Sequence, residues 1–477
     1  MLDNKKIRDA FGSLTGRRGS FVAGMITVVL IIGVAAFARV TPADRIVVQE
    51  AAPVAAGSEG AGDAATSDAA SSDALAEHAE AVDGAEARAM PALTDAMFEF
   101  APITDGVPRM KKPDVVRGLY LNVWAAASNA KLARLIGVAN NTEINAFVID
   151  VKEGGEVGYR SQVPLARAIG ADQAYIGDVR GMLRKLNANG IYPIARIVVF
   201  RDATLADAYP EVAVRHVDGG DWEDRDGHRW VDSFNRQVWD YNIAIAREAL
   251  ELGFAEIQWD YVRFPDVPQS LMRTAAWPAR DGRTKAEGIR EFLQYSRAQL
   301  AEYDAPITAD VFGLAVSAGN DLGIGQHWES MADVTDVLLP MVYPSHFARG
   351  SYGIAHPNAQ PFETIVTAMR HAVRRNAGIE NAAGIRPWLQ DFTLGQPRYG
   401  AAEVRAQIDA VYEAGLKEWV LWHPGSNYTV EALATRDGVV PRFEMTVDPA
   451  ATADTAARSG VLGRPVRLAP DSSGVNR

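Results

Sequence analysis

The feature that most constrains the fold of this chain is a regular alternation of strand and helix patterns that begins near residue 114. Eight stretches rich in β-branched and aromatic residues predict strands; they cover 116–124, 145–152, 192–200, 256–264, 307–314, 337–343, 384–392 and 418–423. Helical periodicity lies between them, at 130–139, 176–188, 238–252, 286–301, 361–376 and 402–414, with a weaker pattern after residue 328. Gly190, Gly253 and Gly415 each follow one of these helices, where a C-terminal glycine is common. Eight alternating units predict a closed (β/α)8 barrel rather than a smaller doubly wound sheet.

The stretch from Glu256 to Pro265 is the clearest strand because polar and apolar residues alternate along it until the proline. A period of two divides its side chains between two faces, with Ile257, Trp259 and Tyr261 on one and Gln258, Asp260 and Val262 on the other. Asp260 therefore lies near the C-terminal end of the strand, where a buried carboxylate needs a charged or hydrogen-bonding partner. Arg263 is the nearest candidate, either in an ordinary ion pair between strand and loop or as part of a functional site.

In a barrel of this kind the active site lies at the C-terminal ends of the strands. Polar and aromatic residues recur at those ends, and we expect them to face one cleft; they are Asp150, Lys152, Arg196, Asp260, Arg263, Asp310, Tyr343, His346, Trp388, Gln390, Asp391, Trp422 and His423. A barrel with only a structural role would not need so many ionisable groups on one rim. The pattern therefore favours an enzyme.

Paired carboxylates beside aromatic rings are typical of glycoside hydrolysis. One carboxylic acid protonates the leaving oxygen, while a second carboxylate attacks the anomeric carbon or activates water. Asp260, held ionised by Arg263, is the predicted nucleophile or base. Asp310 and Asp391 are the candidates for the acid and for a group that stabilises the positively charged transition state. The other rim residues are predicted to bind the carbohydrate substrate, with a structural salt bridge as the alternative for Asp150 and Lys152.

The composition excludes several other chemistries. The chain has no cysteine, which excludes disulfides, thiol nucleophiles and cysteine-ligated metals. Its eight histidines show neither His-x-His nor HExxH spacing, and it has no Walker A or G-x-S-x-G motif, so neither a metal nor a cofactor is expected. The net charge is -12 and no basic cluster indicates a nucleic-acid partner.

Residues 21–38 form an unbroken run of apolar or small residues, close to the length that spans a bilayer. Basic residues outnumber acids in residues 1–20, so the positive-inside rule places this end in the cytoplasm and the rest of the chain outside it. The run predicts a single-pass transmembrane signal anchor in a bacterial-type inner membrane with the barrel in the periplasm. Cleavage at 36–38 would instead give a secreted protein.

Residues 39–110 are rich in Ala, Gly, Ser and acidic residues. They predict a disordered acidic linker, because such a composition buries too little apolar surface to offset the entropy of ordering. The predicted barrel domain covers 111–430. Residues 431–477 lack the strand and helix rhythm and predict a C-terminal tail.

Five segments together resemble a glycoside hydrolase family first catalogued as a domain of unknown function and placed among the TIM-barrel glycosidases; they are Asn145–Lys152, Gln258–Pro265, Ala309–Gly313, Ile324–Gln326 and Leu339–His346. The resemblance covers about 115–430 and implies a TIM barrel with glycosidase chemistry. More distantly, the order of acids is similar to that of α-amylases, which implies catalytic roles for Asp260, Asp310 and Asp391. α-Amylases usually have Glu on the fifth strand where this chain has Asp310, so Glu153 and Glu256 compete for the role of the acid.

Two functions follow from these observations. The first is a membrane-anchored, extracytoplasmic glycoside hydrolase that acts on a polysaccharide or oligosaccharide, for example a glycan of the cell envelope. The alternative is a non-catalytic carbohydrate-binding or envelope scaffold protein with the same cleft. A separation of about 5 to 5.5 Å between the paired carboxyl groups indicates a retaining enzyme and roughly 6.5 to 9.5 Å an inverting one, and the sequence leaves both open.

Overall fold

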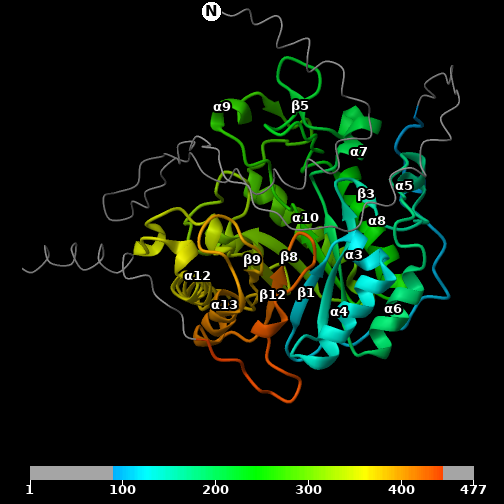
Figure 1. Cartoon of the computed structure of the whole chain (residues 1–477). Coiled ribbons are helices and arrows are strands. Elements are labelled where there is room, and N and C mark those ends of the chain that lie inside the picture. Colours follow the sequence, from blue (N-terminus) through cyan, green and yellow to red (C-terminus); the bar gives the residue numbers. More distant parts are fainter. Residues whose placement is uncertain (1–89, 444–477) are drawn as a thin grey trace, which may run out of the picture.

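The computed structural model describes residues 90–443, and within them eight parallel strands close into a barrel (Figure 1). In chain order the strands are β1 (Arg117–Leu121), β2 (Ala146–Glu153), β4 (Tyr192–Val198), β6 (Glu256–Asp260), β8 (Ile307–Phe312), β9 (Val337–Met341), β11 (Trp388–Gln390) and β12 (Trp419–Trp422). β1 pairs with both β2 and β12, which closes the sheet. The eight predicted strands are all present, and the (β/α)8 architecture is confirmed.

Helices lie outside the barrel between successive strands (Figure 1). They are α4 (Asn129–Asn141), α6 (Val179–Ala188), α8 (Arg236–Leu252), α10 (Lys285–Gln299), α11 (Trp328–Ala332), α12 (Pro361–Asn376) and α13 (Ala401–Glu413). The six predicted helices are present, and the weak pattern after residue 328 is the short α11. Gly253 follows α8 with φ 120°, and a Cβ there would lie 2.5 Å from the carbonyl oxygen of Val107, so this position requires glycine.

Shorter elements extend the loops. They are the helices α3 (Val123–Ala127), α5 (Pro164–Ala168), α7 (Ala203–Ala208) and α9 (Gln269–Met272), the strands β3 (Glu156–Val157), β5 (Arg215–His216), β7 (Ala275–Ala276) and β10 (Gly384–Ile385), and 3-10 turns at Asp95–Met97, Pro210–Val212, Ala301–Tyr303, Gly313–Val316, Pro344–His346, Ser351–Gly353, Pro357–Ala359 and Val430–Ala432. β1 ends earlier than its pattern because the Asn122 side chain accepts a hydrogen bond from Ala125 N and starts α3. β6 ends at Asp260 because Tyr261 has a left-handed φ of 50°.

Apolar side chains fill two separate layers, one inside the barrel and one between the barrel and its helices. Val148 and Leu339 belong to the inner layer and are fully buried. Ile257 and Trp259 of β6 belong to the outer layer. The predicted alternation is therefore confirmed for residues 257–260 and leaves Asp260 on the inner face. It was wrong for the next two residues, because the strand ends at Asp260: Val262 belongs to the outer layer and Tyr261 lines the cleft.

A buried ion network closes the N-terminal end of the barrel. Arg386 lies 2.6 Å from Glu256 and 2.8 Å from Glu418, and Lys112 lies 2.9 Å from Glu418. Glu256 and Arg386 are fully buried. Because Glu256 is the first residue of β6, it lies at the opposite end of the strand from Asp260 and does not compete for the role of catalytic acid.

Part of the predicted linker packs against α8, which corrects the N-terminal boundary of the folded unit. Leu93 O accepts a hydrogen bond from Gln237, and Val107 N donates one to Leu252 O at 3.0 Å. Phe98 and Val107 are buried. Their apolar side chains offset the cost of ordering this segment, so the folded unit begins near residue 93 rather than at 111.

The C-terminal boundary also moves. Leu433 and Ala434 are buried, and Thr435 forms an isolated bridge with Thr142. The folded unit therefore continues to about residue 435, past the predicted boundary at 430. The remainder of the predicted tail lies largely outside the described residues.

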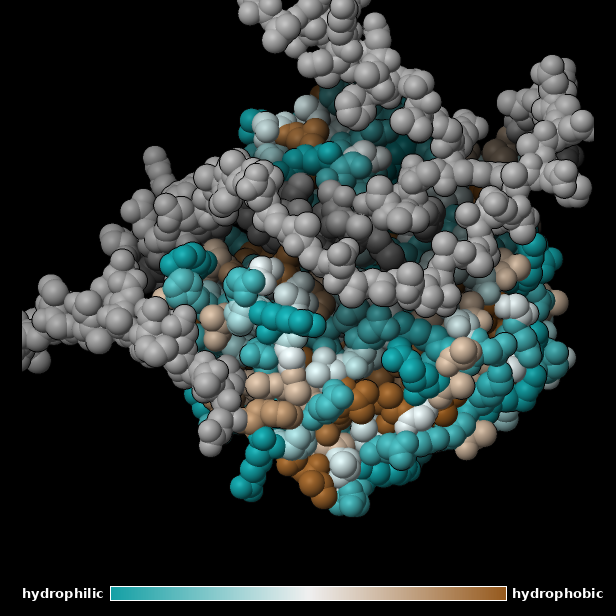
Figure 2. All heavy atoms as spheres, viewed as in Figure 1, coloured by the Kyte–Doolittle hydropathy of each residue, from teal (hydrophilic) through white to brown (hydrophobic). Residues whose placement is uncertain are grey.

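The described surface is mainly hydrophilic on the face shown in Figure 2, with smaller hydrophobic areas. Among the helices of residues 90–443, none is both long and apolar enough to cross a bilayer. The predicted anchor at 21–38 and the linker up to residue 89 lie outside the part of the chain that the structure describes.

Candidate active site

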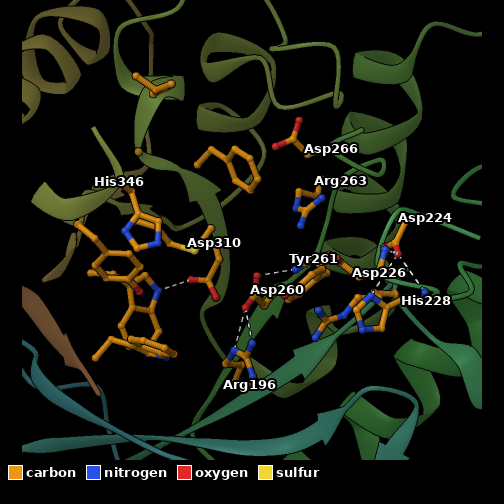
Figure 3. Close-up of a pocket in the computed structure, with 18 of the residues that line it drawn as sticks. Arg196, Asp224, Asp226, His228, Asp260, Tyr261, Arg263, Asp266, Asp310 and His346 are labelled. Atoms are coloured by element: carbon orange, nitrogen blue, oxygen red, sulfur yellow. Dashed lines mark hydrogen bonds and ion pairs between the residues drawn. The ribbon is translucent and has the colours of Figure 1, made fainter. Parts of the chain in front are cut away.

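A cleft of about 220 Å³ opens at the C-terminal ends of the strands (Figure 3). One wall is aromatic and is formed by Tyr343, His346, Phe347, Trp388 and Trp422. The other wall and the rim are polar and include Arg196, Arg201, Asp224, Asp226, His228, Asp260, Arg263, Asp266 and Asp310. The cleft thus brings together most of the ionisable and aromatic residues that the sequence placed at the strand ends.

Arg196 on β4 is the centre of a buried charge cluster in this cleft. Its Nη1 lies 2.5 Å from Asp150 Oδ1 and 2.6 Å from Glu153 Oε2, and its Nη2 lies 2.5 Å from Asp260 Oδ2. Burial alone would lower the pKa of Arg196, but the charges of the three carboxylates raise it well above its usual value. The guanidinium is therefore a fixed positive charge that holds three acids in place.

The end of β6 presents Asp260 to the cleft. Its Oδ2 accepts hydrogen bonds from Nε and Nη2 of Arg196, and its Oδ1 accepts one from Tyr261 N at 2.5 Å. Among the described residues, Asp260 pairs with Arg196 and not with Arg263, so the predicted partner was wrong. Arg196 reaches Asp260 because β4 and β6 are neighbours in the sheet, with Val198 opposite Asp260.

Asp310 lies on β8, next to Asp260 in the sheet, because Trp259 and Ala309 are paired in register. Its Oδ1 accepts hydrogen bonds from Trp388 Nε1 at 2.7 Å and Gln258 Nε2 at 2.9 Å, which are both neutral donors. Burial, and then the nearby charge of Asp260, raise the pKa of Asp310 well above its usual value. Its surroundings therefore favour the protonated form of this carboxyl group.

Asp150 and Lys152 do not form a salt bridge with each other. Asp150 accepts a hydrogen bond from the Tyr120 hydroxyl at 2.5 Å, and burial raises its pKa to about 6 although Arg196 opposes the shift. Lys152 lies 2.7 Å from Asp202, with both side chains fully buried. A register shift between Asp150 and Lys152 in the pairing of β2 with β4 accounts for their different surroundings. Lys152 is therefore a structural residue outside the cleft lining, contrary to the prediction of substrate contact.

Three other predicted residues are held by loops rather than exposed in the cleft. Asp391 accepts hydrogen bonds from Thr429 N at 2.8 Å and Thr429 Oγ1 at 2.7 Å. Gln390 is fully buried and accepts a hydrogen bond from Ser345 N. His423 uses Nδ1 to accept a backbone hydrogen bond in its own turn. Within residues 90–443 none of the three lines the cleft, so the structure does not bring Asp391 together with Asp260 and Asp310.

The aromatic wall contains the four predicted aromatic residues. The rings of Tyr343 and Trp422 have centroids 5.7 Å apart and an interplanar angle of 35°. Burial lowers the pKa of His346 to about 4, so this ring is neutral at physiological pH. A neutral aromatic surface beside the carboxyl groups of Asp260 and Asp310 can pack against the apolar face of a sugar ring.

The chain matches a known protein family. A family model described as "Putative glycosyl hydrolase domain" matches residues 118–428. The chain belongs to this family. The match begins in β1 and extends beyond β12, so it includes the barrel and its cleft. The family resemblance predicted from five sequence segments is confirmed.

Several solved structures are similar to this glycosyl hydrolase domain. A hypothetical protein from Ruminiclostridium thermocellum is 39% identical over 43% of this chain and 98% of its own, with a TM-score of 0.38. The PgaB (BpsB) glycoside hydrolase domain from Bordetella bronchiseptica is 13% identical over 65% of this chain and 95% of its own, with a TM-score of 0.47. The alpha-galactosidase TtGalA from Thermus thermophilus is 14% identical over 76% and 65%, with a TM-score of 0.41. No curated protein matches the chain.

Two residues that hydrogen-bond to acids of this site were not predicted from the sequence. Tyr120 at the end of β1 and Gln258 on β6 donate hydrogen bonds to Asp150 and Asp310. The alternation along β6 places Gln258 on the same face as Asp260, and this signal could have identified it. Tyr120 could have been identified in the same way, because it is the last inward-facing residue of β1. The rim residues 224–230 gave no such signal, because they belong to a loop that carries no strand or helix pattern.

Three residues on the rim of the glycosyl hydrolase domain have the chemistry of metal ligands. One ligand atom from each of Asp224, Asp226 and His228 lies within 4.8 Å of the others. Asp224 is already satisfied, because it accepts hydrogen bonds from Trp230 Nε1 at 2.9 Å and from backbone groups of its own turn. These bonds, chiefly those from His228 and Trp230, lower the pKa of Asp224 to about 2 against its burial. The turn thus explains this cluster without a cation.

Proposed function

We propose that this protein hydrolyses glycosidic bonds with Asp310 as the general acid and Asp260 as the second carboxylate. The observation that carries the proposal is the contrast between two neighbouring aspartates. Asp260 forms an ion pair with Arg196, whereas Asp310 is buried among neutral donors and has a raised pKa. Two neighbouring acids whose surroundings differ in this way can take different catalytic roles, one as the general acid and the other as the base or nucleophile.

The proposed reaction follows from these two environments. Asp310 donates its proton to the glycosidic oxygen as the bond to the anomeric carbon breaks. Asp260, with lone pairs left after its bonds to Arg196 and Tyr261, either attacks the anomeric carbon or removes a proton from an attacking water. Proton NMR of the first product formed distinguishes the two routes, because direct attack gives net retention and attack by water gives inversion. The substrate is a carbohydrate, bound against the aromatic wall.

The role of Asp310 is tested by Asp310→Asn. Loss of a general acid is expected to lower kcat/KM by about 10² to 10⁴ on natural glycosides, but much less on nitrophenyl glycosides, whose leaving group needs little protonation. In the wild type, kcat/KM should fall with rising pH only well above the usual range of aspartate, because Asp310 must remain protonated. The Asn variant should lack this limb of the pH profile.

The control for Asp310→Asn is Asp304→Asn. Asp304 is exposed and has a left-handed φ of 46°, which asparagine tolerates. Equal losses on natural and activated glycosides in Asp310→Asn would contradict an acid role. Binding of glycans without hydrolysis by the full-length wild type, across a panel of defined polysaccharides, would support the non-catalytic alternative.

We further propose that residues 21–38 anchor the protein in the membrane with the barrel in the periplasm. The support is the apolar run itself and the basic residues before it. A periplasm-active reporter fused after residue 60 should be active, and a cytoplasm-active reporter at the same position should be inactive. The reverse pattern would contradict the proposed orientation.

A further inference from the structure

Arg263 is a cleft residue whose surroundings differ from those of the other two arginines in the cleft. It follows β6 and lies between three aromatic rings, with Cζ 4.7 Å from the ring centroid of Tyr261, 4.8 Å from that of Phe312 and 5.2 Å from that of Trp230. These rings fix the plane of the guanidinium and keep water from its faces. The side chain is therefore held in one orientation in the wall of the cleft (Figure 3).

The charge of Arg263 has no carboxylate partner among residues 90–443. Arg196 forms ion pairs with three acids and Arg201 pairs with Glu153 at 2.7 Å, but no acid in this range lies within 4.0 Å of Arg263. Its one hydrogen bond within the described chain runs from Nη1 to Phe264 O at 3.0 Å. A guanidinium has five N–H donors, so most of those of Arg263 are unused.

The unused donors of Arg263 face the cleft. Nε and Nη2 have no partner in the described chain and are not among its buried polar atoms without a partner, so both keep some access to solvent. Burial nevertheless lowers the pKa of Arg263 below the usual arginine value. A half-desolvated cation with free donors is costly to maintain unless a ligand compensates its charge.

We propose that Arg263 binds a carboxylate of the substrate, so that the glycan contains a uronic acid next to the bond that is cleaved. A planar guanidinium matches the two oxygens of a carboxylate in a bidentate pair, which is why arginine suits this task. Figure 3 shows Arg263 between Asp266 and Asp260, which places the acidic sugar close to the catalytic pair. The inference rests on the proposed function and adds the class of substrate to it.

The other charged residues of the cleft favour Arg263 as the position that binds a substrate carboxylate. Asp224 and Asp226 also line the cleft and disfavour a substrate carboxylate beside them. Arg196 is saturated by its three carboxylates, so it does not attract a fourth. Arg201 also lines the cleft but pairs with Glu153, so Arg263 is the cleft arginine that has no carboxylate partner among residues 90–443 and is the favoured partner of a substrate carboxylate.

The test uses the full-length protein and matched pairs of substrates. The probes are oligogalacturonate, oligomannuronate and glucuronate-containing oligosaccharides, each compared with its carboxyl-reduced counterpart, which differs by CH₂OH in place of COO⁻. The wild type is expected to prefer one acidic member over its reduced counterpart in kcat/KM. This preference should fall by about 10- to 100-fold in Arg263→Gln, and Arg263→Lys should give an intermediate value because it keeps the charge without the planar fork.

The control is Arg370→Gln, which removes a surface arginine that pairs with Glu413. This variant should keep the wild-type preference. Equal activity on acidic and reduced members, or an unchanged preference in Arg263→Gln, would overturn the inference.

Calorimetric binding to Asp260→Asn separates failure of this inference from failure of the proposed function. Binding of an acidic oligosaccharide that Arg263→Gln abolishes, without any hydrolysis by the wild type, would support the inference and contradict the glycosidase. Hydrolysis of neutral glycans with no binding of any uronate would contradict the inference and leave the glycosidase in place.

Discussion

Asp260→Asn is expected to lower kcat by a thousandfold or more while the barrel remains folded. The amide has nearly the shape of the carboxylate but cannot attack the anomeric carbon or accept a proton from water. The loss of stability should be small, because Arg196 keeps Asp150 and Glu153 as ion-pair partners. Glycan affinity should therefore be largely retained, and turnover and melting temperature should be measured on the same sample.

Asp333→Asn provides the matched control for Asp260→Asn. It also removes a carboxylate from an arginine pair, with Arg290, but on the surface and away from the cleft. It should leave hydrolysis unchanged. If Asp260→Asn is folded and hydrolyses glycans at the wild-type rate, Asp260 is not part of the mechanism, and Asp310 would have to work with Glu153.

Arg196→Met is expected to have the largest effect on stability. Removing the guanidinium leaves Asp150, Glu153 and Asp260 close together without the cation that pairs with all three, and breaking a buried pair in this way costs roughly 3 to 5 kcal/mol. Urea unfolding at pH 8 measures this loss. A loss below about 1 kcal/mol would show that water compensates the three acids.

The destabilisation by Arg196→Met should depend on pH in a defined direction. Folding raises the pKa of Asp150 from its usual value of 3.8 to about 6, so the stability linked to this group is complete below about pH 4 and is lost as the pH rises through 6. Arg196 opposes this shift, and its removal moves the window to higher pH. The variant should therefore be less destabilised at pH 5 than at pH 8, while the surface variant Arg290→Met should show a small loss at both.

The sequence predicts the barrel well because the information is local. Each strand and helix pattern depends on neighbouring residues, and the alternation along β6 was enough to place Asp260 on the inner face at the strand end. The acid pair could be proposed for the same reason, since the ends of parallel strands meet at one edge.

The partners of these residues depend on contacts between strands, which a single sequence does not contain. Arg263 is three residues from Asp260, but Arg196 on the adjacent strand is the ion-pair partner because of the register of β4 against β6. Lys152 was misplaced because a local register shift cannot be read from alternation. The prediction of a disordered linker, which depended on composition, was likewise wrong for residues 93–107. A few apolar side chains within this polar region are enough to hold the segment on α8.

The ion network of Glu256, Arg386 and Glu418 closes the N-terminal end of the barrel, so the cleft is a pocket that opens on one side only. Within the described chain, a glycan cannot thread through the barrel axis, because this network and the inner apolar layer fill it below the cleft. Substrate, water and both products must then exchange through the same mouth. A long polysaccharide therefore has to lie across that mouth. Each product must leave before the next segment of the glycan can bind, so we expect product release to limit kcat when the chemical step is fast.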